Sequence, residues 1–264
     1  MEFNKDSKVT IVLTSCGRFD LLERTLKSID TFNTYPVKEV IFTEDSGDEK
    51  IYDVIPENWK PYCKVFINKP GLGQLKSIDL AYENVSTEYI FHCEDDWEFY
   101  RYHFIEDSLK ILESDTDIHQ VWLRSYHHDV RSNCLMDGNQ LLHTLGKHKV
   151  IDNVGYHVLE CHSKKWQGFS FNPGLRRISD YHLVKPFSQY IDGASGESKA
   201  SIKFAALGKY PVILENSAVL HTGWHNHVTS GTEIDRQKWK MKKHRVLIIC
   251  GFIAGMITGY LIAS

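Results

Sequence analysis

Short β-rich runs alternate with amphipathic stretches in the first third of the chain, and this alternation limits the fold more than any other feature. The β-rich runs cover residues 9–14, 37–43, 64–68 and 88–93, with helix-like patterns between them at 20–32 and 73–85. Strand–helix–strand alternation of this kind predicts a mainly parallel sheet with helices on its faces. A chain of 264 residues, 42% of them hydrophobic, can bury the core that one such α/β domain needs.

The rest of the chain is less regular. Helices are expected at 103–114 and from about Glu197 to Leu207, and strands at 119–126, 156–160, 211–215 and 218–222. Residues 127–153 are polar and irregular, and this pattern predicts a loop that passes over the site.

A possible membrane segment lies near the C-terminus, because residues 246–263 carry no charge. A helix of this length would extend about 27 Å, close to the hydrocarbon thickness of a bilayer. It follows six basic residues between 236 and 245, which places the preceding domain, residues 1–240, on the cytoplasmic side of a single-pass anchor. Glycines at 251, 255 and 259 permit a homodimer through this helix. The alternative to a membrane span is a C-terminal helix buried in the protein.

Charge separates the body of the chain from its C-terminal end. The total is −3, yet no acid follows Asp235, so the body is more acidic than the total suggests. An acidic body argues against a nucleic-acid partner.

Polar residues follow four of the expected strands, where parallel sheets bind their ligands. These strand ends read TSCGR (14–18), EDSGD (44–48), NKPGLGQ (68–74) and CEDDW (93–97). In the last of them, Glu94, Asp95 and Asp96 form a run of like charges. If the strand continued through them, Glu94 and Asp96 would share a face. Carboxylates are ligands that suit Mg²⁺ or Mn²⁺, although an acidic run is also common on a solvated loop.

From Val9 to about His103 the sequence resembles the GT-A fold, a Rossmann-like fold of nucleotide-sugar-dependent glycosyltransferases, and in particular their family-2-like group. The tripeptide Glu94-Asp95-Asp96 is similar to the EDD motif of N-acetylglucosaminyltransferases, and the resemblance extends more loosely over residues 191–228. It implies a hexosyl- or N-acetylhexosaminyltransferase that uses Mn²⁺ or Mg²⁺ and a nucleoside-diphosphate sugar, foremost a UDP-sugar. The acceptor, whether glycan, lipid or protein, is left open.

The same resemblance implies roles for residues at the strand ends. Asp96 would bind the metal, and the donor would contact Thr14, Cys16, Arg18, Glu44, Asp45, Glu94 and Asp95. Many family members have Asn where Asp79 stands and a basic residue near Gln74. The sequence departs from the family pattern of sugar-phosphate contacts at these two positions. Lys69 and Lys76 are the candidate substitutes, and Gln74 stays among the expected donor contacts.

A carboxylate base on the acceptor hydroxyl is the expected helper for an inverting transfer. Glu197 is the first candidate and Asp192 the second. Without a catalytic role, Glu197 would lie in the first turn of a helix capped by Ser195, where an acid is favourable.

Three histidines in 221-HTGWHNH-227 complete the candidates. His221 is expected to bind the metal or the diphosphate, whereas His221, His225 and His227 together have a spacing that could hold Zn²⁺.

For the enzyme as a whole, the sequence predicts a transferase that adds a single sugar, because one membrane span does not suit extrusion of a polymer. A zinc-dependent hydrolase and a non-catalytic nucleotide-sugar-binding module are the alternatives.

Overall fold

The computed structural model describes residues 1–130, 142–190 and 192–223. Its helices are α1 (Phe19–Phe32), α2 (Ile51–Val54), α3 (Gln74–Glu83), α4 (Phe104–Ser114), α6 (Ile178–Val184) and α7 (Gly193–Ala206), with short turns η1 (Lys60–Tyr62), η2 (Tyr126–Val130) and η3 (Phe187–Gln189). The strands are β1 (Val9–Ser15), β2 (Val40–Glu44), β3 (Cys63–Ile67), β4 (Tyr89–Glu94), β5 (Trp97–Phe99), β6 (Ile118–Trp122), β7 (His143–Ile151), β8 (Val154–Cys161), β9 (Gly174–Arg177), β10 (Tyr210–Leu214) and β11 (Val219–His221).

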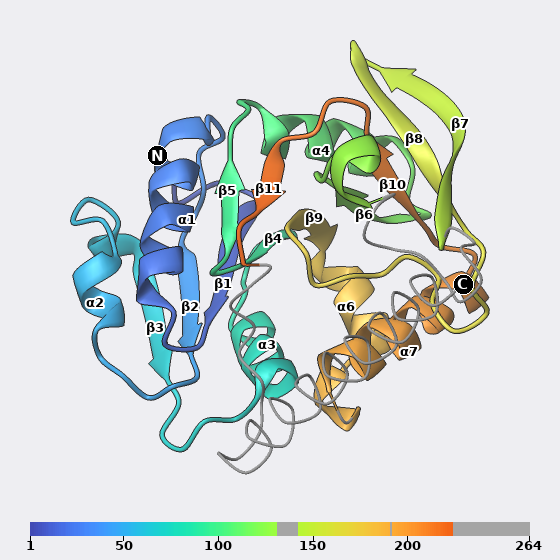
Figure 1. Ribbon diagram of the computed structural model, residues 1–264. Helices are drawn as coiled ribbons and strands as arrows, with labels where there is room; N and C mark the ends of the chain where they lie inside the picture. The colour runs from blue at the N-terminus through green and yellow to red at the C-terminus, as the bar shows by residue number, and fades with distance from the viewer. Residues whose placement is uncertain (131–141, 191, 224–264) are drawn as a thin grey trace, which may run out of the picture. The chain divides into compact units, whose positions relative to one another are not determined.

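A nine-stranded sheet in the order β3-β2-β1-β4-β9-β6-β10-β8-β7 forms the centre of the domain (Figure 1). Strands β1 to β4 are parallel to one another, and β6 pairs in parallel with β10. The short strand β9 lies antiparallel between β4 and β6. The predicted α/β domain is confirmed. Its sheet is mixed, since β8 also pairs antiparallel with β10 and β7. Strands β5, β7 and β9 were not predicted from the sequence.

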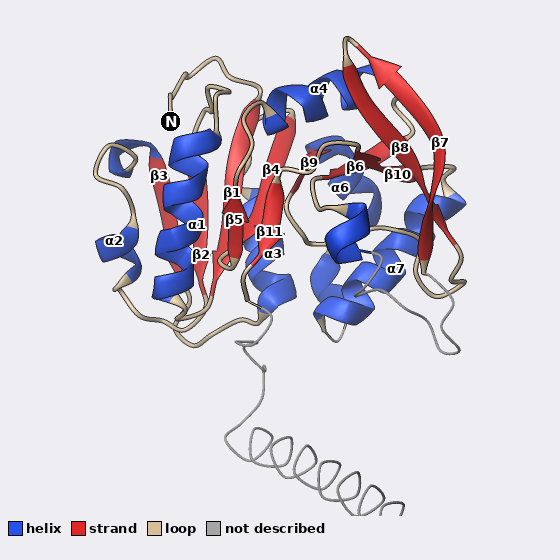
Figure 2. Ribbon diagram, turned by 45° about the horizontal axis from the view of Figure 1, so that its top comes forward, coloured by secondary structure: helices blue, strands red, loops and turns tan. Residues whose placement is uncertain are grey.

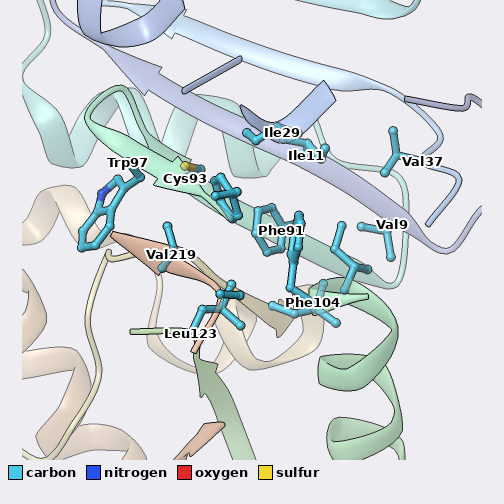
Figure 3. Packing of buried hydrophobic residues seen from close by; sticks show 14 of the residues in the cluster. Val9, Ile11, Ile29, Val37, Phe91, Cys93, Trp97, Phe104, Leu123 and Val219 are labelled. Atoms are coloured by element: carbon cyan, nitrogen blue, oxygen red, sulfur yellow. The ribbon is translucent and has the colours of Figure 1, made fainter. Parts of the chain in front are cut away.

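Helices cover both faces of the sheet, which explains why β1 is buried throughout. Side chains alternate along a strand, so Ile11 faces α1 and Val12 faces the opposite side, where α3 and α7 pack. In the cluster of buried residues that contains Ile11, Phe91 of β4 packs on Phe104 of α4 with ring centroids 5.2 Å apart (Figure 3). A strand buried on both faces needs no polar alternation.

The expected loop at 127–153 is wrong for its second half, which forms β7. Strand β7 pairs with β8 as a hairpin that projects at the far edge of the sheet from β3 (Figure 2). The turn between Ile151 and Val154 has two residues, Asp152 and Asn153, both with positive φ. Such a turn is typical of hairpins. An edge strand exposed to solvent can be rich in Lys and His, so β7 lacks the apolar pattern of a buried strand.

Helix α7 begins four residues earlier than expected, at Gly193. Its N-cap is Asp192, whose side chain accepts a hydrogen bond from the Ser195 backbone N–H (2.7 Å). The Ser195 hydroxyl accepts one from the Asp192 backbone N–H (3.0 Å), which completes a capping box. Ser195 is therefore the third residue of the helix, and its interpretation as the N-cap is wrong.

By internal contacts the chain divides after Trp224. The unit Met1–Trp224 contains all the elements above, whereas the predicted membrane segment 246–263 lies outside the described residues. Among the helices that are described, none has the length and apolar character needed to cross a membrane.

The capping box predicts a measurable loss of stability. Asp192→Ala should lower the free energy of unfolding by about 1 kcal/mol, because it removes the acceptor for the Ser195 N–H. Asp192→Asn keeps an acceptor oxygen and serves as the matched control, with a smaller loss. Urea unfolding of the two variants decides the point, and an equal loss in both would contradict the cap.

Candidate active site

The carboxyl ends of β1, β2 and β4 meet at one edge of the sheet because the three strands are in register. Ser15 pairs with Glu44 of β2, and Thr14 pairs with Glu94 of β4. The polar segments that follow these strands are thereby brought together, as the sequence predicted.

The acidic run leaves the strand at Glu94, so its side chains do not simply alternate between two faces. Asp95 and Asp96 form a turn between β4 and β5, and both are buried, with 1% and 4% of their surface exposed. Arg18 donates from Nε to Oδ2 of Asp95 (3.1 Å) and from Nη1 to Oδ2 of Asp96 (2.8 Å), and its Nη2 also donates to Asp95. The guanidinium therefore offsets the repulsion between the two aspartates.

Asp96 also contacts His221, the predicted second metal ligand. Nε2 of His221 lies 3.3 Å from Oδ2 of Asp96, because β11 pairs with β5 and sets His221 opposite Trp97. Burial alone would raise the pKa of Asp96, but the bonds from His221 and Arg18 hold that pKa below its usual value. A Cβ at Gly223 would lie 2.1 Å from Oδ2 of Asp96, so only glycine allows this close approach.

Trp97 is buried next to His221. The two rings are tilted by 33° with their centroids 4.5 Å apart. The guanidinium of Arg124 lies over the same indole, 5.5 Å from a ring centroid. Trp97 therefore supports His221 by packing.

The donor set around Asp96 suits Mn²⁺ or Mg²⁺ when substrate oxygens complete the shell. A carboxylate oxygen and an imidazole nitrogen are acceptable ligands for Mn²⁺. Within the described ranges, no group of three or more His, Cys, Asp or Glu could hold a metal ion. Asp96 and His221 thus offer two ligand atoms of kinds that a divalent cation accepts.

The other two acids of the run differ in protonation. Burial, with the nearby charges of Asp96 and Glu197, raises the pKa of Glu94 to about 8. Burial raises the pKa of Asp95 to about 6, although Arg18 opposes this change. At neutral pH Glu94 is mostly protonated, so the three acids do not carry three charges.

Asp45 and Glu44 hold the loops that follow β1, β2 and β3. Asp45 accepts four hydrogen bonds, from the side chains of Asn68 (2.9 Å) and Ser77 (3.0 Å) and from the backbone N–H groups of Leu72 (2.7 Å) and Gly73 (2.8 Å). Glu44 accepts from the backbone N–H groups of Gly17 (3.0 Å) and Ser46 (2.8 Å). The hydrogen bonds accepted by both carboxylates therefore stabilise the conformations of these loops.

The remaining donor candidates lie around the same edge. Gln74 donates to Glu94 (2.9 Å), whereas Lys69 is exposed and pairs with Glu49 (3.2 Å). Thr14 is buried near the end of β1. Burial, with the nearby charges of Asp45 and Glu44, raises the pKa of the Cys16 thiol. Their predicted contacts with a donor remain predictions.

Asp79, which stands where many family members have Asn, is buried and accepts three hydrogen bonds. They come from Tyr181 Oη (2.9 Å) and the backbone N–H groups of Phe187 (2.9 Å) and Ser188 (2.7 Å). Asp79 therefore joins α3 to α6 and η3.

The two candidate bases have different surroundings. Oε1 of Glu197 accepts hydrogen bonds from Ser170 Oγ (2.8 Å) and the Phe171 backbone N–H (2.7 Å). Burial raises the pKa of Glu197, and the charges of Arg124 and Arg176 oppose this. Asp192 is exposed and caps α7. His225 and His227 lie outside the described residues, so the zinc cluster stays a prediction.

Arg124 was missed by sequence reasoning. It follows the end of β6 and makes a buried bidentate pair with Asp129 (2.7 and 2.6 Å). The expected strand at 119–126 placed Arg124 within a strand. Strand β6 in fact ends at Trp122. With that end, Arg124 would have been among the polar residues that follow a strand, and so among the candidate site residues.

Comparison with known proteins identifies the family of the chain. The sequence profile of Glycosyl transferase family 2 matches residues 10–171, more than half of the chain. No curated protein matches the sequence of the chain.

Several solved structures share the fold. The mannosyltransferase PcManGT from Pyrobaculum calidifontis, in complex with GDP-Man and Mn²⁺, is similar with a TM-score of 0.56 and 14% identity over 80% of this chain and 57% of that one. S. aureus TarS residues 1–349 give 0.56 and 13% over 82% and 61%. A longer S. aureus TarS structure gives 0.54 and 10% over 82% and 37%.

This chain therefore spans less than two thirds of these structures. At such identities the likeness shows the fold, whereas the match of the family profile over more than half of the sequence shows the family. The resemblance to the family-2-like group is confirmed: the chain belongs to glycosyl transferase family 2.

Proposed function

We propose that this glycosyltransferase moves a single sugar from a nucleoside-diphosphate sugar to an acceptor hydroxyl, with Mn²⁺ or Mg²⁺ and with inversion. The observation that carries the proposal is the convergence of Asp96, His221 and Arg18 at the carboxyl ends of β1 and β4. Together they offer a ligand pair for a cation and a positive side chain beside the expected diphosphate.

On the donor side, the reaction needs charge to be offset as the diphosphate departs. A bound divalent cation supplies Lewis-acid stabilisation of that charge. Asp96, kept ionised by His221 and Arg18, would hold it. Asp45 keeps the loop at 68–73 in place, which shapes the donor side.

On the acceptor side, Glu197 would take the proton from the acceptor hydroxyl while the hydroxyl oxygen attacks the anomeric carbon. The bond to the diphosphate breaks on the opposite face, which inverts the configuration. Asp192 remains the second candidate, although its side chain accepts the capping hydrogen bond of α7.

The nucleotide is open to test. PcManGT is described with GDP-Man and Mn²⁺, whereas the sequence favoured a UDP-sugar, so both nucleotides belong in a donor panel. The similarity of the acidic run to that of N-acetylglucosaminyltransferases adds UDP-N-acetylglucosamine.

The cellular setting belongs to the same proposal. A single C-terminal anchor at 246–263 would keep the enzyme on the cytoplasmic side of a membrane, as a monomer or homodimer, and would suit transfer of one sugar to an unidentified glycan, lipid or protein. A zinc hydrolase would instead need His225 and His227, and a binding module would take up the donor without turnover.

Removal of the metal ligand gives the first test. Asp96→Asn should lower Mn²⁺-dependent release of nucleoside diphosphate on the order of 100-fold or more, because the charge of the leaving group is no longer offset. Chelation of the metal should have the same effect on the unaltered chain. Glu98→Gln is the matched control, since Glu98 is two residues away and pairs with Arg24 outside the site. Equal activity of Asp96→Asn and the unaltered chain would refute the assignment.

The pH dependence tests the base. Glu197 acts only when ionised, and its pKa is raised, so kcat should fall as the pH drops through a value above the about 4.3 of an ordinary glutamate. Glu197→Gln should lower kcat by about 10²–10⁴-fold. A pH–rate profile on the full chain measures both effects. Full activity of Glu197→Gln would move the role to Asp192.

A further inference from the structure

A buried hydroxyl holds the proposed base by one of its two oxygens. Ser170, with 3% of its surface exposed, donates to Oε1 of Glu197, and the Phe171 backbone N–H donates to the same oxygen. Among the described residues no hydrogen bond is made to Oε2. Two donors on one oxygen fix the plane of the carboxylate and leave the second oxygen to an acceptor hydroxyl.

The direction of the Ser170 proton is set by a third contact. The Asn172 backbone N–H donates to Ser170 Oγ (3.2 Å), which occupies a lone pair of that oxygen. A serine hydroxyl has only one proton to donate, and here it goes to Glu197. The hydroxyl therefore acts as a donor to the carboxylate in its ionised form.

Ser170 is in turn held by Gln120, a fully buried side chain of β6. Nε2 of Gln120 donates to the Ser170 carbonyl oxygen (2.9 Å), and Oε1 accepts from the Ser170 backbone N–H (3.2 Å). A buried amide is costly unless its polar atoms are satisfied, and here both are used on one residue. The chain thus places a polar side chain inside the sheet to fix Ser170.

We propose that Ser170, locked by Gln120, is the positioning residue of the acceptor side: it orients Glu197 so that Oε2 meets the acceptor hydroxyl. The proposal rests on the proposed function, in which Glu197 is the base. It gives Gln120 and Ser170 a role in rate, beyond the filling of hydrogen-bonding capacity in the core.

Charge around the carboxylate supports this role. Burial disfavours ionised Glu197, whereas the two hydrogen bonds and the cations Arg124 and Arg176 favour it. Of these, the Ser170 hydroxyl is the contact that a substitution of one atom removes. Loss of that bond should raise the pKa of Glu197 further, since a donor to the charged form is lost.

Ser170→Ala tests the proposal in the full chain. We expect kcat to fall about tenfold, since a hydrogen bond to a charged group is lost, while KM for the donor changes less than about twofold. The acidic limb of the pH–rate profile, where kcat falls as the pH drops, should move to higher pH. Ser170→Thr, which keeps a hydroxyl, should restore the limb, and Ser170→Ala combined with Glu197→Gln should cost no more than Glu197→Gln alone.

Ser201→Ala is the matched control. Ser201 is a buried serine of α7 whose hydroxyl accepts from the Gln167 backbone N–H (2.8 Å) and donates to the Ser198 carbonyl oxygen (2.8 Å), so its side chain does not hydrogen-bond the carboxylate of Glu197. It should lower the melting temperature as Ser170→Ala does, but leave the acidic limb in place. If both variants lower kcat equally and neither moves the limb, Ser170 has only a structural role.

Direct titration of Glu197 separates this inference from the proposed function. Carbon-13 NMR of glutamate carboxyls, with Glu197→Gln to assign the signal, should show a higher pKa in Ser170→Ala than in the unaltered chain. If the unaltered chain releases no nucleoside diphosphate, the proposed function fails while the titration still decides the contact. An unchanged titration in Ser170→Ala overturns the inference even in an active enzyme.

Discussion

The fold brings four acidic side chains to one edge of a parallel sheet, and their mutual repulsion is the constraint on which the site depends. Glu94, Asp95 and Asp96 follow one strand, and the charge of Glu197 on α7 acts on Glu94. The structure resolves the repulsion in two ways. Glu94 keeps its proton at neutral pH, and Arg18 bridges the two aspartates. Asp96, whose pKa is held below its usual value, is the acid that suits a cation, together with His221.

Much of this arrangement could be predicted, because the responsible signals are local. Continuous apolar runs predicted β1, β2 and β4, and polar residues follow each of them, among them Arg18, Asp45 and Asp96. The parallel pairing of those strands brings these segments together. The fold class and this polar edge follow from periodicity and strand ends, whereas a donor at this edge is implied by the resemblance to the family and stays a prediction.

The rest depends on contacts between distant segments, which a pattern in one segment does not record. Strand β9 is only four residues long, which is too short for a clear pattern. Ser170 and Gln120 are 50 positions apart, and their hydrogen bond is seen only in the folded domain. Strand β7 is polar because it lies at an edge, and only the turn at Asp152 and Asn153 marks it. Glu197 is a candidate base by its residue type, but the hydrogen bonds that hold its side chain come from Ser170 and Phe171, in a loop with no motif of its own.

The pairing of β11 with β5 also sets an order of assembly. Trp97 and Asp96 belong to the first hundred residues, whereas His221 reaches them only through the last strand of the domain. During synthesis, the parallel strands that carry the acids leave the ribosome well before this partner exists. Contacts so far apart in sequence form late, because a long loop must close first. The contact between Asp96 and His221 is therefore expected to form after the parallel strands that support Asp96.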